Sequence, residues 1–139
     1  MRERRLRTII GLSLIASHFF TVLLVLYFGI TGGFDFDQVT TTVGLVSPMF
    51  IAYTAAIITY FTDTRNSRRR GSVLAFPFVV VSISTVMLFS MTLLVATVLA
   101  AHDIGFENFE QFKGTVLALE AMFAVYLGRF VPILFKTTE

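Results

Sequence analysis

The stretch Gly114 to Phe135, GTVLALEAMFAVYLGRFVPILF, is long enough to cross a lipid bilayer, yet it contains two charged residues, Glu120 and Arg129. As a helix it would measure roughly 33 Å, about the thickness of one hydrocarbon core. An ionisable side chain at that depth costs about 2.5–3.5 kcal/mol or more, so it usually faces protein or water rather than lipid. The stretch therefore indicates a membrane protein and hints at a polar interior.

The composition of the 139-residue chain indicates one integral membrane domain spanning residues 1–139. Hydrophobic residues make up 55% of the sequence and charged residues 14%, and the mean hydropathy is +0.80. The segments between the apolar runs are about a dozen residues long at most, too short for a soluble core, which excludes a soluble enzyme. The chain has no cysteine and two distant histidines, so we expect neither a metal nor another cofactor.

Four apolar runs predict four transmembrane helices, at about 8–30, 43–61, 73–101 and 114–135. Near the start of the second run, Ser47 and Pro48 leave two alternatives open. Ser47 could cap a helix whose first residue is Pro48, which suits the preferences of both residues, or Pro48 could kink a helix that begins earlier. No internal repeat is apparent along the chain.

The segment between the last two runs, HDIGFENFEQFK at 102–113, has phenylalanine at every third position, at Phe106, Phe109 and Phe112. This spacing predicts a short interfacial helix with its rings in the headgroup region. A loop with anchoring aromatic residues is the alternative.

The distribution of positive charge predicts the topology. If the amino terminus is cytoplasmic, Lys113 is the only one of the 11 Lys and Arg residues that lies in an outer loop. The other ten Lys and Arg residues then lie on the inner side: Arg2, Arg4, Arg5, Arg7, Arg65, Arg68, Arg69, Arg70, Arg129 and Lys136. The positive-inside rule therefore predicts that both termini are cytoplasmic and that the protein resides in the cell's cytoplasmic membrane.

The third run carries a stripe of small, hydroxyl-bearing and aromatic residues on one helical face: Ser82, Thr85, Phe89, Thr92, Ala96 and Ala100. A packing seam between helices and the wall of a pore both explain such a stripe. Phe89 would then be a candidate for a hydrophobic gate.

Glu120 shares a face of the last run with Ala124 and Gly128, so we expect it to face protein. Arg129 lies about 180° around the same helix, so it cannot pair with Glu120 there, and snorkelling to the inner headgroups explains it. His18, near the centre of the first run, could partner Glu120 or be a neutral, hydrogen-bonded core residue. The structural and the ion-conducting interpretations of Glu120 both remain open.

Four arginines, Arg65, Arg68, Arg69 and Arg70, cluster between the second and third runs. They could bind an anionic cytosolic ligand such as a nucleotide, an oligonucleotide or a lipid headgroup, or they could only set the topology. Catalytic motifs are absent from the sequence, so we expect no enzyme activity.

We therefore hypothesise a homo-oligomeric ion channel or pore of the bacterial cytoplasmic membrane, because four helices in one chain leave little room for an aqueous path. An anionic ligand at the arginines would make it a ligand-gated membrane effector. The alternatives are a structural or regulatory subunit that binds a larger membrane partner, and a small secondary transporter.

Overall fold

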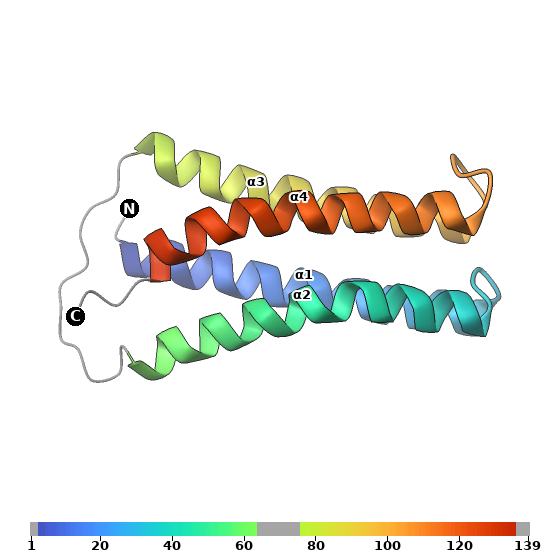
Figure 1. The fold of residues 1–139 in the computed structure, drawn as a ribbon, viewed down its shortest axis with the longest axis horizontal. Coiled ribbons are helices and arrows are strands. Elements are labelled where there is room, and N and C mark those ends of the chain that lie inside the picture. Colours follow the sequence, from blue (N-terminus) through green and yellow to red (C-terminus); the bar gives the residue numbers. More distant parts are fainter. Residues whose placement is uncertain (1–2, 64–75, 136–139) are drawn as a thin grey trace.

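The computed structural model describes residues 3–63 and 76–135, and within these ranges the chain is all helical. The elements are α1 (Glu3–Thr31), α2 (Phe36–Asp63), α3 (Phe76–Ala101) and α4 (Phe109–Phe135). Three helices are long and apolar enough to cross a membrane, through Thr8–Thr31, Phe36–Thr59 and Phe76–Ala101. The predicted all-α, membrane-embedded character is confirmed at this level. α4, which carries three charges in its first half, is not one of the three, but it has 27 residues and runs beside them (Figure 1).

The four helices form an antiparallel bundle with both tight loops at one end (Figure 1). α1 and α3 run in one direction, and α2 and α4 return, so the start of α1 and the end of α4 lie at the same end. α1 packs against α2 and α3, and α4 packs against the same two helices. α1 and α4 also meet across a diagonal of the bundle, whereas α2 and α3 are not in contact over the described ranges.

A capping box starts α2 earlier than the predicted boundary at residue 43. The Asp35 carboxylate accepts a hydrogen bond from the Gln38 backbone N–H (2.8 Å), and the Gln38 side chain accepts one from the Asp35 N–H (3.0 Å). These two bonds satisfy N–H groups that lack partners at a helix start. The polar residues after Phe36 therefore belong to the helix rather than to a loop.

Pro48 lies inside α2, so the alternative in which Ser47 caps a new helix is wrong. The Ser47 hydroxyl instead donates to the Val43 carbonyl at 2.6 Å, as a serine inside a helix does. Proline removes one backbone hydrogen bond and crowds the preceding turn. Figure 1 shows α2 changing direction near its middle, in agreement with the second alternative.

The phenylalanines of the second loop pack into the bundle instead of forming an interfacial helix. α4 begins at Phe109, and the Asn108 side chain accepts a hydrogen bond from the Gln111 N–H at 3.0 Å. Phe112 is 1% exposed and stacks on Phe34 of the first loop, with ring centroids 5.8 Å apart. This stack therefore joins the first loop to the first turn of α4.

The two hairpins, α1–α2 and α3–α4, repeat one pattern at a spacing of 73 residues, which was not apparent from the sequence. α2 starts at Phe36 and α4 at Phe109, and each start follows a short loop. At this spacing, ranges 32–53 and 105–126 share identical residues at Gly32/Gly105, Phe36/Phe109, Gln38/Gln111, Thr42/Thr115, Val43/Val116, Met49/Met122, Phe50/Phe123 and Tyr53/Tyr126. Residues 73 apart are called equivalent below.

Candidate functional site

The centre of the bundle holds a histidine that is fully buried. His18, on α1, is 0% exposed, and its Nδ1 lies 3.1 Å from the Leu14 carbonyl oxygen one turn earlier. A carbonyl oxygen only accepts hydrogen bonds, so Nδ1 must carry a proton. This contact fixes the ring orientation and directs Nε2 away from its own helix.

Aromatic rings from the other three helices surround this imidazole. His18 stacks between Phe50 of α2 and Phe89 of α3, at centroid distances of 6.0 and 5.8 Å. Phe89 in turn stacks on Phe123 of α4, with centroids 3.8 Å apart and ring planes 4° from parallel. We call these four rings the aromatic layer. The layer crosses the bundle from α2 through α1 and α3 to α4 at the level of His18.

Glu120 reaches the same level from α4. It is 5% exposed, and its Oε1 lies 3.6 Å from His18 Nε2. Within the described part of the chain, neither carboxyl oxygen has a hydrogen-bond partner. A buried carboxylate without compensation is costly, so the nearby imidazole is its main electrostatic counterpart. α4 thus brings to His18 the acidic residue that the sequence singled out.

The protonation of this pair follows from the positions of its atoms. Nδ1 holds its proton against Leu14, which leaves Nε2 and the carboxyl group facing each other. The pair is electrically neutral overall when one proton lies on either Nε2 or the carboxyl group, and any other state places a net charge in the apolar core. Nε2 and the carboxyl group are therefore the two places where a single proton leaves the pair without a net charge.

Several hydroxyl groups line the core near this pair. Ser90 of α3 donates to Ser17 of α1 at 2.9 Å, next to His18 along α1. The buried Thr21 and Thr97 donate to the carbonyl oxygens of Ser17 and Leu93, one turn back in their own helices. The helices therefore meet through small hydroxyl-bearing residues, as expected where membrane helices pack closely.

The predicted stripe on the third run is divided by the structure. Ser82 and Phe89 are buried in the bundle, and the Ser82 carbonyl accepts a hydrogen bond from Tyr126 of α4 at 3.4 Å. Thr92 is exposed, and Thr85 is half-buried. Both hydroxyls donate to carbonyls of their own helix, Thr92 to Leu88 and Thr85 to Val81. One edge of the stripe is thus a packing seam, and the other faces the outside of the chain.

The remaining candidate residues are basic. Arg65, Arg68, Arg69 and Arg70 lie outside the described residues. Arg129 belongs to α4, but its side chain is also outside the described part. Among the residues that are described, no three His, Cys, Asp or Glu side chains group as a metal site.

Sequence reasoning missed Phe50 and Phe123, the two rings that complete the aromatic layer. The chain contains 16 phenylalanines, and periodicity cannot separate a core ring from a lipid-facing ring when both surroundings are apolar. The repeat is the signal that could have found them, because Phe50 and Phe123 are equivalent positions.

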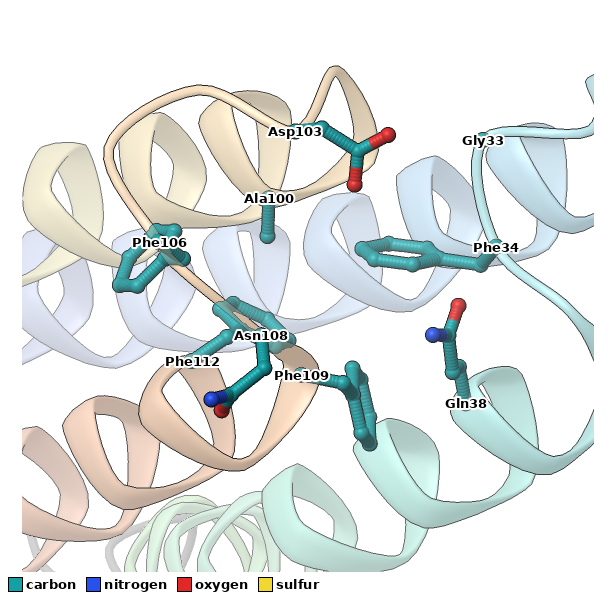
Figure 2. Close-up of a pocket in the computed structure, with 9 residues that line it drawn as sticks. All are labelled: Gly33, Phe34, Gln38, Ala100, Asp103, Phe106, Asn108, Phe109 and Phe112. Atoms are coloured by element: carbon teal, nitrogen blue, oxygen red, sulfur yellow. The ribbon is translucent and has the colours of Figure 1, made fainter.

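A cavity of about 40 Å³ lies between the two loops (Figure 2). It has room for a few water molecules. Its walls combine the rings of Phe34, Phe109 and Phe112 with the polar side chains of Gln38, Asp103 and Asn108. Glu120 follows Phe112 by two turns of α4, roughly 12 Å along the helix axis. The cavity is thus a polar depression above the buried pair.

Comparison with protein-family models, with curated proteins and with solved structures finds no match for this chain.

Proposed function

We propose that this chain is a four-span protein of the cytoplasmic membrane that works as a homo-oligomeric channel for protons or other cations, controlled by the His18–Glu120 pair. The four-span arrangement is supported by α4, which runs alongside the three helices that are long and apolar enough to span a membrane. The start of α1 and the end of α4 lie at the same end of the bundle, which agrees with an even number of spans. The distribution of Lys and Arg residues supports a cytoplasmic location for that end of the bundle.

The observation that carries the proposal is the 3.6 Å approach of Glu120 to His18 inside an apolar bundle. A buried ion pair is a poor device for stability, because apolar residues of similar size would hold the helices as well or better. Ionisable residues within membrane segments therefore mark ion or proton pathways by default. A neutral pair that holds one exchangeable proton suits that role.

The aromatic layer supports a gate at this level. Phe89 and Phe123 stack at 3.8 Å beside the imidazole, so rings fill the core where the pair lies. Hydrophobic constrictions of this kind block ions by excluding water. Movement of these rings would let water reach the His18–Glu120 pair. An anionic cytosolic ligand would act on the channel by binding the arginine cluster at 65–70.

A second candidate function is a structural or regulatory subunit of a larger membrane complex. The same layer favours it, because stacked rings between helices are also what packing without conduction requires. Flux measurement separates the two. Purified protein in liposomes should dissipate an imposed potassium or proton gradient faster than protein-free liposomes do. Flux of either ion down its own gradient supports a channel, obligatory coupling of a solute to the proton gradient indicates a transporter, and the absence of flux supports the subunit.

A further inference from the structure

We propose that copies of this chain join side by side in the membrane by repeating the contact between their own two hairpins. In this arrangement, α3–α4 of one copy packs against α1–α2 of the next. The inference rests on the homo-oligomer of the proposed function and specifies its interface. The template is the contact that the chain already makes within itself.

The two hairpins are not related by a two-fold axis. α1 lies beside its equivalent α3 in one layer of the bundle, and α2 lies beside its equivalent α4 in the other layer (Figure 1). A two-fold axis along the bundle would separate at least one of these like pairs, and it would make the α1–α4 and α2–α3 diagonals equivalent. Over the described ranges, α1 contacts α4 but α2 does not contact α3. The contact is therefore heterologous, since each hairpin uses a different face.

A heterologous contact leaves one face of each hairpin unused. On α1, Leu14, His18 and Val25 are buried inside the bundle. Their equivalents on α3 are large apolar residues that are exposed: Met87, Met91 and Val98. α3 therefore presents outward the positions that α1 presents to the second hairpin.

The complementary face is on α1. Phe89, Leu93 and Ala96 of α3 are buried in the bundle. Their equivalents on α1 all face outward: Ala16, Phe20 and Leu23. The free face of α3 and the free face of α1 are thus the two halves of the same contact, and the next copy is the occupant that matches both.

The repeated contact stays within the plane of the membrane. Ser17 and Ser90 are equivalent positions, and their hydroxyls are hydrogen-bonded at 2.9 Å. The second hairpin is therefore displaced sideways from the first without a shift along the helices. A heterologous contact that repeats without an axial shift can close into a ring, and in a membrane such a ring buries both free faces.

The repeat also identifies which residues meet between copies. Within one chain, His18 stacks on Phe89. The equivalent pair between copies is Met91 of one chain and Ala16 of the next, a large residue opposite a small one. Ser47 is the equivalent of Glu120, so the contact between copies carries no carboxyl–imidazole pair, and each copy keeps one pair within itself.

Disulfide cross-linking tests this arrangement, because the natural chain contains no cysteine. The double variant Met91→Cys/Ala16→Cys, oxidised in native membranes, should give a ladder of dimer, trimer and larger species that ends at the closed ring. The single variants Met91→Cys and Ala16→Cys should give none of these bands. Ala52→Cys/Val125→Cys is the matched control. Both of these residues are exposed and they are equivalent to each other, so they lie on neither face of the contact.

A dimer from either single variant would overturn the proposal, because it would show a two-fold contact. A double variant that is folded and inserted but gives no ladder would overturn it as well. Flux in liposomes is read separately: a ladder without flux leaves the contact intact and refutes the channel, whereas flux without a ladder refutes the contact alone.

Discussion

His18 Nε2 lies 3.6 Å from Glu120 Oε1, across the diagonal between α1 and α4. The other ring nitrogen, Nδ1, donates a hydrogen bond to the Leu14 carbonyl. Nε2 is therefore the atom of His18 that can share a proton with the carboxyl group. The bundle therefore places one acid and one base at its centre, on helices from different repeats.

The first prediction concerns the His18 tautomer. Because Nδ1 donates to Leu14, nitrogen-15 NMR of histidine-labelled protein in bilayers should show a protonated Nδ1 whatever the state of Nε2. The His102→Gln variant removes the only other histidine, so that the signal is unambiguous. A spectrum with Nδ1 unprotonated would contradict the assigned geometry.

The second prediction separates stability from function. His18→Phe/Glu120→Leu replaces the buried pair with apolar residues, which is often neutral or stabilising by about 1–4 kcal/mol. His18→Ala alone should be destabilising by about 3–5 kcal/mol if the pair is ionised, because Glu120 loses its counterpart. Thermal unfolding in detergent measures both effects, with exposed His102→Phe as the control.

We expect the double variant His18→Phe/Glu120→Leu to remain folded but to conduct no ions in liposomes. Flux at the wild-type rate in a stable double variant would show that the pair has no role in conduction. A double variant less stable than His18→Ala would show that the pair is a structural lock.

Much of the fold could be predicted from the sequence, because four long apolar runs leave few other arrangements. The starts of the helices could not be predicted, because residues 36–42 are polar and resemble a loop unless the Asp35–Gln38 capping box is recognised. The Asn108–Gln111 bond begins α4 in the same manner. Apolar composition hid the repeat, because many of its equivalent positions exchange one hydrophobic residue for another.

The site was predictable only in parts. Glu120 stood out as an acid in an apolar run, and His18 stood out as the only ionisable residue of another. Their meeting depends on which helices approach across the diagonal, and helical periodicity within one segment carries no information on that. Phe123 had no distinguishing feature until its ring was found on Phe89.

The third prediction is the topology. Reporter fusions at Arg69 and Glu139 should be active in the cytoplasm, and those at Gly33 and Asn108 outside it, because nearly all positive charges then lie inside. The structure places Gly33 and Asn108 at the same end of the bundle, around one cavity. An external signal from Arg69 would refute the arrangement.

The fourth prediction concerns the arginine cluster. Changing Arg65, Arg68, Arg69 and Arg70 to Gln should abolish binding of a short oligonucleotide or of ATP at the cytoplasmic face, and wild-type binding should weaken steeply as salt is raised. Arg5→Gln, at the exposed start of α1, is the single-charge control. Unchanged binding with altered topology would show that the cluster only orients the protein.

The most direct test of the central claim is cation flux through Glu120→Gln in liposomes, with Glu110→Gln as its matched control. Glu110 lies on the same helix, but its side chain is 73% exposed, and its partner is Lys113. Glutamine keeps the shape of Glu120 and removes its exchangeable proton, so flux should fall by tenfold or more, while the oligomer size and the unfolding temperature stay unchanged. Wild-type flux in Glu120→Gln, with Glu110→Gln behaving alike, would contradict a conducting role for the buried pair.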